Sequence, residues 1–276
     1  MPNVSKGTPR TVRIAIAGLG PIGKRVAQAL DDGIDGMVLS AVAVNNPGKH
    51  RQFLATLNAP PRVLSIADLC DAADIVIECA PSALVESIVA PFVGKGTTAL
   101  VLSASALLEL PHLIDLAKES GGQIVVPTGA LVGLDAVTAA AEGNIASVRI
   151  ITRKPVKGLV GAPYVIKNNI DLETADKPIK IFEGSARDAG RGFPANLNVA
   201  VALSLAGIGP DKTQVEIWAD PALTRNTHRI EVVSDSAIFS MAINNIPSEN
   251  PKTGLITALS VIAYLRKQHA ALRVGT

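Results

Sequence analysis

The run Val12-Arg13-Ile14-Ala15-Ile16-Ala17, followed by Gly18-Leu19-Gly20-Pro21-Ile22-Gly23, indicates the fold class of this 276-residue chain. The first six residues are mostly apolar, without strict alternation, as in a strand buried on both faces. A helical pattern follows the second six and extends to about residue 30. Glycines spaced G-x-G-x-x-G between a strand and a helix are typical of a dinucleotide-binding turn. We therefore predict an α/β domain that contains such a turn.

The residues of this turn each have a physical reason to be there. Gly18 permits the tight turn, Gly20 lets the backbone approach a pyrophosphate, and Gly23 allows close packing of helix on strand. Pro21 and Ile22 open the helix, whose N-terminus offers free N–H groups and a partial positive charge to that anion. We predict that these five residues form part of a cofactor site. The alternative is a glycine-rich turn that binds no ligand.

The end of the second predicted strand, residues 38–44, bears on the choice of cofactor. An Asp or Glu at this point holds the ribose 2′-OH of NAD, but this chain has Asn45 and Asn46 there. Neutral asparagine does not repel a 2′-phosphate, and the nearby Lys49 and Arg51 can bind one. We expect NAD or NADP as cofactor, with NADP favoured and Asn45 in contact with it. The alternative is that the two cations simply begin the next helix in solvent.

The loop after the strand at residues 75–78 is a second candidate part of the cofactor site. In a doubly wound sheet, ligands bind beyond the carboxyl ends of the strands. Ala80 and Pro81 follow this strand directly, so we predict that they lie beside the cofactor. Cys79 has no histidine near it in sequence to activate it, which favours a packing role over a nucleophilic one.

The order of apolar runs predicts two parts of different architecture. Strands alternate with helices as far as residue 126, which indicates a Rossmann-type, doubly wound parallel sheet. After Gly129 strands outnumber helices, which indicates a second α+β domain. We divide the chain into a dinucleotide-binding domain, residues 1–133, a substrate domain, residues 134–250, and a C-terminal helix, residues 251–276, packed back on the first domain. The apolar stripe expected on that helix consists of Leu255, Leu259, Ile262 and Leu265.

Composition excludes several classes of protein. Hydrophobic residues make up 48% and charged residues 18%, which argues against a disordered chain. The 26 basic and 24 acidic residues leave a net charge of +2, too little to attract nucleic acid in general. No apolar run is long enough to span a membrane, residues 1–7 do not resemble a secretory signal, and the four histidines lack metal-ligand spacing. Two cysteines are too few for a disulfide framework, so we expect a cytoplasmic protein. From the histidine spacing we expect no metal.

Several motifs in the second half of the chain are more specific than the glycine turn. They are residues 128–136, 152–155, 182–188 and 193–200, Asp220-Pro221, Arg225-Asn226-Thr227-His228 and Asn250-Pro251-Lys252-Thr253. In these motifs the chain resembles the L-aspartate dehydrogenase family, and the resemblance extends from the glycine turn to the last helix. It implies oxidative deamination of L-aspartate through iminoaspartate to oxaloacetate and ammonia with NAD or NADP, in some bacteria for pyridine nucleotide biosynthesis.

The resemblance also implies roles for three residues. The family's active-site histidine maps onto His228, and its cofactor contacts in this half map onto Ala130 and Asn196. The unperturbed pKa of a histidine is near 6.5, which suits a general acid or base at His228. Ala130 would act through its backbone beside the nicotinamide. The alternatives are a surface or capping histidine, and an asparagine (Asn196 or Asn198) that only caps a helix start.

Aspartate carries two carboxylates, so cations are expected in its pocket. Lys154, Arg187, Arg225 and Lys252 all lie in the resembling motifs and are the candidates. Any of them can instead be an ordinary surface charge. The sequence does not choose among them.

Two further functions stay open. The chain departs from the family's pattern at Arg229 and in residues 233–239, so the substrate can be another small amino or keto acid. A dinucleotide-binding sensor without turnover is the alternative of a different class. We expect a homodimer, because the edges of a small second sheet invite two-fold pairing and the family contains dimers.

Overall fold

The first half of the chain forms a six-stranded sheet in the computed structural model, which describes residues 11–172, 174–194, 197–248 and 254–275. Its strands are β1 (Val12–Ala17), β2 (Met37–Ala43), β3 (Arg62–Leu64), β4 (Ile75–Glu78), β5 (Thr98–Val101) and β6 (Gln123–Val125). They lie in the order β3-β2-β1-β4-β5-β6, and all neighbours are parallel. This is the doubly wound order of dinucleotide-binding folds, with its switch point between β1 and β4. The predicted fold class is confirmed.

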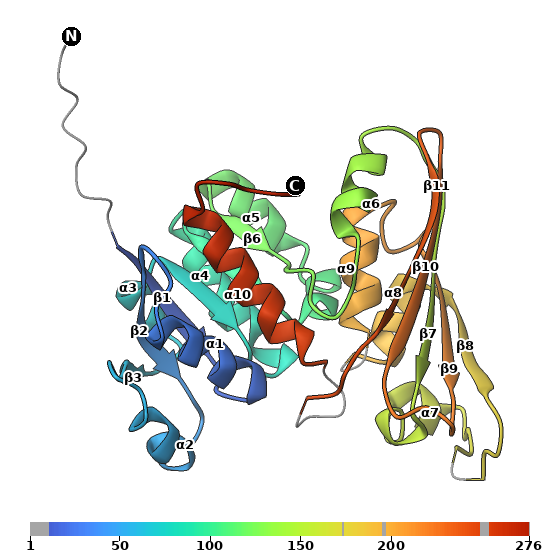
Figure 1. Cartoon of the computed structure of the whole chain (residues 1–276), viewed down its shortest axis with the longest axis horizontal. Coiled ribbons are helices and arrows are strands. Elements are labelled where there is room, and N and C mark those ends of the chain that lie inside the picture. The colour runs from blue at the N-terminus through green and yellow to red at the C-terminus, as the bar shows by residue number, and fades with distance from the viewer. Residues whose placement is uncertain (1–10, 173, 195–196, 249–253, 276) are drawn as a thin grey trace.

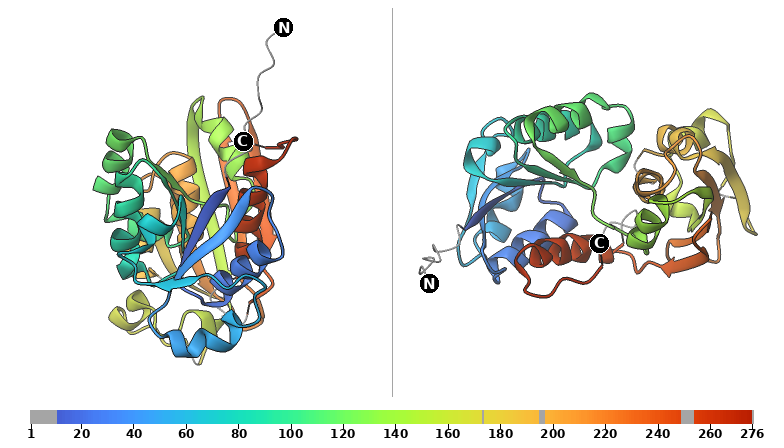
Figure 2. Two further views of the ribbon diagram at one scale, coloured as in Figure 1. Left: turned by 90° about the vertical axis from the view of Figure 1, so that its left-hand side faces the viewer. Right: turned by 90° about the horizontal axis from the view of Figure 1, so that it is seen from above.

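Helices cover both faces of this sheet (Figures 1 and 2). Ile14 and Ile16 of β1 pack toward α1 (Pro21–Asp31) and α10 (Ile256–His269). Ala15 and Ala17 of the same strand pack in the opposite core. That core involves α3 (Leu69–Ala72), α4 (Val85–Gly94) and α5 (His112–Ser120). The strand therefore reads as a continuous apolar run because both of its faces are buried. Helix α2 (Pro47–Leu54) and the short turns η1 (Ser82–Leu84) and η2 (Ala104–Leu108) complete this half.

The second half forms a mixed five-stranded sheet. Its strands are β7 (Ile145–Lys154), β8 (Ile179–Ser185), β9 (Gln214–Ala219), β10 (Thr227–Ser234) and β11 (Ile238–Asn244). The order is β11-β10-β7-β9-β8, with β7 and β9 parallel and the other pairs antiparallel. Helices α6 (Leu134–Ala141), α8 (Ala186–Gly192) and α9 (Asn198–Ala206) lie on the face turned toward the first half (Figure 1). The turn η3 (Val156–Gly158) and helix α7 (Pro163–Lys167) follow β7.

Helix α10 lies beside α1, although the two are far apart in sequence (Figure 1). The apolar stripe expected on it is partly wrong, because Leu255 and Leu259 are 52% and 48% exposed. The buried face instead consists of Thr257, Ala258, Val261, Ile262 and Leu265. Ala258 packs in the core that also contains residues of α1, whereas the two large leucines lie outside the buried face. The domain boundaries at 133/134 and 250/251 stay predictions.

Two further properties of the described residues concern membranes and metal ions. No helix in the described part of the chain combines the length and apolar character needed to cross a membrane. Among the same residues, no group of three or more His, Cys, Asp or Glu side chains is placed to hold a metal ion.

Candidate active site

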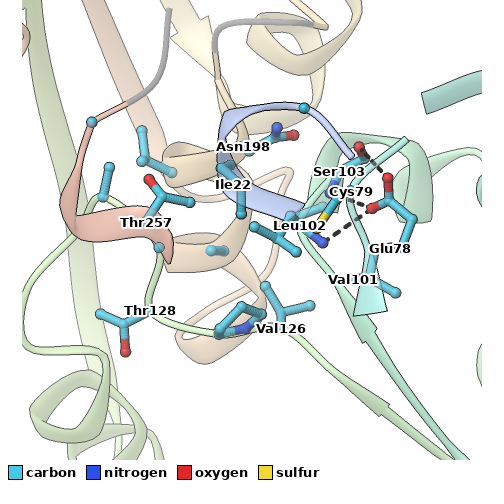
Figure 3. Close-up of a pocket in the computed structure, with 18 of the residues that line it drawn as sticks. Ile22, Glu78, Cys79, Val101, Leu102, Ser103, Val126, Thr128, Asn198 and Thr257 are labelled. Atoms are coloured by element: carbon cyan, nitrogen blue, oxygen red, sulfur yellow. Dashed lines mark hydrogen bonds between the residues drawn. The ribbon is translucent and has the colours of Figure 1, made fainter. Parts of the chain in front are cut away.

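A cavity of about 410 Å³ lies between the two halves of the chain. On the sheet side it is bordered by the loops that follow β1, β4, β5 and β6. On the other side it is bordered by the start of α9, the end of β7 and the start of β10. Figure 3 shows it between Asn198 and Thr257 on one side and Glu78 and Ser103 on the other. The carboxyl ends of parallel strands are where such folds bind ligands.

The three glycines of the turn have different spatial reasons to be glycine. Gly18 has a φ of +98°, and a Cβ there would lie 2.5 Å from the carbonyl oxygen of Cys79. A Cβ on Gly23 would lie 2.0 Å from the carbonyl oxygen of Gly18, so this glycine lets α1 approach β1. A Cβ on Gly20 would meet nothing within 4 Å, and this residue lines the cavity with Pro21, Ile22 and Gly23. The space at Gly20 therefore fits a ligand that approaches the backbone, as a pyrophosphate does.

Glu78 is a site residue that sequence reasoning missed. It ends β4, is fully buried and lines the cavity. Its carboxylate accepts hydrogen bonds from the backbone N–H groups of Ala80, Leu102 and Ser103 at 3.0, 3.1 and 2.8 Å, and from Ser103 Oγ at 3.0 Å (Figure 3). It thus ties together the loops after β4 and β5. Its burial raises its pKa. The available signal was an acidic residue that ends an otherwise apolar strand.

The residues that follow Glu78 line the same cavity. Cys79, Ala80 and Pro81 line the cavity beside the glycine turn. Burial and the nearby Glu78 raise the pKa of the Cys79 thiol well above its ordinary value. The thiol is therefore protonated at neutral pH, which argues for packing rather than nucleophilic attack.

The inner face of the second sheet changes from apolar to polar where it reaches the cavity. Every second residue of β7 points inward, and the last two of that series are Thr152 and Lys154. Strand β10 runs antiparallel to β7 and begins at this end, so its residue His228 stands opposite Thr152. All three side chains are at most 3% exposed. Lys154 and His228 both line the cavity.

His228 is held as a neutral imidazole. Its Nδ1 lies 3.1 Å from the hydroxyl oxygen of Thr152. Burial lowers its pKa from 6.5 to about 3, and the positive charge of Lys154 lowers it further in the same direction. Desolvation opposes the charged form of a basic group, so the ring carries no net charge at neutral pH.

This lowered pKa predicts how stability depends on pH. The unfolded chain binds a proton at His228 below about pH 6.5, whereas the folded chain resists it until about pH 3. Stability from this residue is therefore present above pH 6.5 and lost as the pH falls toward 3, by about 1.4 kcal/mol per pH unit. In urea unfolding at several pH values, wild type should lose stability more steeply than His228→Asn. Equal slopes would contradict the burial of a neutral ring.

Two residues from the C-terminal part of the chain hold the loop near Ala130 by hydrogen bonds. Ala130 lines the cavity, and its carbonyl oxygen accepts a hydrogen bond from Asn245 Nδ2 at 2.9 Å. The backbone N–H of Gly129 donates to Ser260 Oγ at 3.0 Å. Residues far along the chain therefore position the segment that the family resemblance assigned to the cofactor.

The start of α9 contributes an asparagine to the cavity wall. Asn198 Oδ1 accepts hydrogen bonds from the backbone N–H of Ser105 at 3.0 Å and from its hydroxyl at 2.8 Å. This side chain therefore joins α9 to η2 across the two halves, which is a bridging role that the sequence did not indicate. Asn196, predicted to contact the cofactor, lies outside the described residues.

The candidate cations separate clearly in space. Lys154 lines the cavity, whereas Arg187 lies elsewhere and forms a two-point ion pair with Asp211 at 2.6 and 2.9 Å. Arg225 is exposed and does not line the cavity. The assignment of Arg187 and Arg225 to the substrate pocket is therefore not supported by their placement. Lys252 lies outside the described residues.

Asn45 is exposed and lies after the carboxyl end of β2, outside the lining of the cavity. The adjacent Asn46 caps α2, and its side chain accepts a hydrogen bond from the backbone N–H of Lys49 at 3.3 Å. In a doubly wound fold this edge of the sheet receives the adenosine ribose. Asn45 lies at this edge of the sheet, and its contact with a cofactor stays a prediction.

The doubly wound sheet, its glycine turn and the buried histidine across the cavity define a pyridine-nucleotide-dependent dehydrogenase. Residues 18–127 match the family model described as homoserine dehydrogenase, NAD binding domain, and residues 135–268 match the one described as aspartate dehydrogenase, C-terminal. The chain belongs to the L-aspartate dehydrogenase family.

Three known proteins illustrate this membership. An L-aspartate dehydrogenase of Bradyrhizobium diazoefficiens is 63% identical over 265 residues, which cover 96% of this chain and 94% of that protein. L-aspartate dehydrogenase 3 of Bordetella bronchiseptica is 56% identical over 264 residues, covering 95% and 97%. The crystal structure of aspartate dehydrogenase from Thermotoga maritima shares the fold, with a TM-score of 0.75 at 24% identity, over 96% of this chain and 99% of that one.

Proposed function

We propose that this protein catalyses the NAD(P)-dependent oxidative deamination of L-aspartate. The observation that carries the proposal is the convergence of a glycine turn, a buried lysine and a buried histidine on one cavity, in a member of this family. The substrate amine is oxidised by two electrons to the imine, with loss of a hydride from Cα, which a bound nicotinamide would accept, and of a proton from the amino group. One water then hydrolyses the resulting iminoaspartate to oxaloacetate and ammonia.

The cofactor side of the cavity suits a dinucleotide. Gly20 and the N-terminus of α1 face the place where a pyrophosphate fits, as the open space at Gly20 indicates. When bound, the nicotinamide supplies the hydride acceptor. Ala80, Pro81 and Ala130 border the cavity from the loops after β4 and β6, where they exclude water and can orient the ring. Asn196 is proposed as a further contact from the family resemblance alone.

Lys154 is our choice of substrate anchor. It is buried at the end of β7, lines the cavity and acts electrostatically on His228 in the same wall. A buried ammonium group attracts a carboxylate more strongly than a solvated one does, because the local dielectric is low. A carboxylate of aspartate bound by Lys154 would lie close to the imidazole. We propose His228 as the residue that faces the reacting part of the substrate.

For the cofactor we propose that both NAD and NADP are used, with NADP favoured. Asn45 and Asn46 carry no charge that would repel a 2′-phosphate. Burial lowers the pKa of His50, and the positive charges of Lys24 and Lys49 lower it further, so positive charge gathers around that residue of α2. A phosphate monoester would be attracted to this edge of the sheet.

The deciding experiment is an assay of the purified protein by the absorbance of reduced nicotinamide. We expect turnover with L-aspartate and a higher kcat/KM with NADP⁺ than with NAD⁺. L-glutamate, L-alanine, D-aspartate and L-malate serve as comparison substrates. Faster turnover of another acid would select a dehydrogenase of different specificity. Cofactor binding without any turnover would select a sensor.

We also propose a cytoplasmic homodimer. Both cysteines are free thiols, as in proteins of reducing compartments. Strands β8 and β11 are the two edges of the second sheet, and Ile238 on β11 is 79% exposed. In the described part of the chain no helix covers the outer face of that sheet (Figure 1). Light scattering of the purified protein tests for two copies per particle.

A further inference from the structure

The contact between His228 and Thr152 bears on which ring nitrogen of His228 carries the proton. The general base predicted from the sequence needs a ring nitrogen with a free lone pair facing the substrate. A neutral imidazole has one nitrogen that donates and one that accepts. The hydrogen-bond partner of Nδ1 determines which ring nitrogen carries the proton, and so whether Nε2 donates or accepts in the cavity. Here that partner is the Thr152 hydroxyl, 3.1 Å from Nδ1.

Two arrangements of the protons are conceivable at this contact. In the first, the Thr152 O–H donates to Nδ1, and the ring proton is on Nε2. In the second, Nδ1–H donates to the Thr152 oxygen, and the hydroxyl proton needs an acceptor elsewhere. Thr152 is fully buried, and among the described residues its hydroxyl has no other hydrogen-bond partner. The second arrangement therefore leaves a buried donor unsatisfied, which is strongly disfavoured.

We propose that Thr152 is a positioning residue that holds His228 in the tautomer with its proton on Nε2, so that the resting site presents a hydrogen-bond donor to a substrate oxygen. Nδ1 is occupied by the hydroxyl, and no described residue bonds to Nε2, which is left for the cavity that His228 lines. The identity of that oxygen rests on the proposed function: it belongs to a carboxylate of aspartate or to the carbonyl of oxaloacetate.

The surroundings of the ring keep it in this neutral form. Lys154, two residues along β7 from Thr152, is the charged group that acts on the imidazole, and its positive charge opposes protonation. Burial acts in the same direction. A neutral ring with Nε2–H cannot take a proton from water at that nitrogen. Under this proposal His228 binds and polarises a substrate oxygen as a hydrogen-bond donor, rather than taking up a proton as a general base.

The test combines nuclear magnetic resonance with steady-state kinetics. Thr152→Val removes the hydroxyl at nearly constant shape, Thr152→Ser keeps it, and Thr138→Val makes the same change at an exposed position on α6 that lies outside the cavity lining. The ¹⁵N shifts of labelled histidine report which ring nitrogen carries the proton, and the signal of His228 is assigned by its loss in His228→Gln. The chain contains only four histidines, so the spectrum is simple.

We expect a protonated Nε2 in wild type, Thr152→Ser and Thr138→Val, and a mixture of tautomers in Thr152→Val. We also expect Thr152→Val to raise the KM for L-aspartate about tenfold without changing the Kd of the cofactor, and Thr152→Ser to restore it. A wild-type spectrum with Nδ1 protonated would overturn the proposal, even if Thr152→Val fails to fold. The proposal would also be overturned if Thr152→Val folds and keeps both the wild-type tautomer of His228 and the wild-type KM for L-aspartate. A failure of the proposed function would appear separately, as a wild type that does not oxidise aspartate.

Discussion

Replacement of His228 by alanine is expected to lower kcat for L-aspartate about 10²–10³-fold, the usual loss when one preorganised donor is removed from an active site. The Kd of the nicotinamide cofactor should hardly change, because the imidazole lies on the second sheet, across the cavity from the glycine turn. Stopped-flow or steady-state rates, together with a fluorescence titration of reduced cofactor, measure the two effects. Unchanged turnover in this variant would remove His228 from the reaction.

A glutamine at the same position separates two roles for the ring. The side-chain amide of Gln can donate an N–H but cannot take up a proton at neutral pH. If His228 acts as a donor, His228→Gln should retain about tenfold more activity than His228→Ala. If His228 acts as a base, the two variants should be equally slow. The comparison therefore checks by kinetics what the tautomer experiment checks by spectroscopy.

The second large effect is expected at the glycine turn, where two alanine substitutions should fail for different reasons. In Gly23→Ala the new methyl group would lie 2.0 Å from the backbone oxygen of Gly18, so the turn or α1 must move. Such overpacking costs about 1–3 kcal/mol of stability, and the displaced turn should also lose cofactor affinity. In Gly20→Ala the methyl group would meet no protein atom within 4 Å, and the backbone already has φ −69° and ψ −173°, which alanine adopts freely.

Gly20→Ala should therefore keep its stability within about 0.5 kcal/mol and yet bind the dinucleotide more than about tenfold more weakly. The methyl group would occupy the space that a pyrophosphate needs. Urea unfolding and a titration with reduced cofactor measure the two quantities in both variants. If Gly20→Ala binds the cofactor normally, the pyrophosphate does not pass over this residue. If Gly23→Ala is as stable as wild type, the close contact at this glycine is not needed.

The candidate cations that lie outside the cavity and the partly wrong stripe on α10 have a common cause. Arg187 and Arg225 lie in motifs of the family, but a motif does not say which way a long charged side chain points. Arg187 forms an ion pair with Asp211, 24 residues away in sequence, and does not line the cavity. Similarly, the stripe predicted on α10 consists of large aliphatic side chains. The helix instead buries Ala258 in the core that also contains residues of α1, so burial there does not follow side-chain size.

Local sequence determined the parts of this protein that depend on neighbours along the chain. The run around Gly18 contains the strand, the tight turn and the helix start, and its backbone requirements are visible in the residue types alone. Apolar runs of the right length located β1 and β4, because strands buried on both faces leave few alternatives. The three-residue strand β3 escaped notice, since it is too short and too exposed to leave a pattern.

The assembly of the site depends on the tertiary structure, because its contacts join residues that are far apart in sequence. The antiparallel register of β7 and β10 places Thr152 opposite His228, 76 residues later in the chain. Packing of the two loops around Glu78 likewise depends on β4 and β5 being neighbours. Burial of these polar groups determines their protonation, and burial is a property of the folded chain as a whole. The sequence therefore shows which residue types can do the chemistry, whereas the fold determines the protonation state of each one.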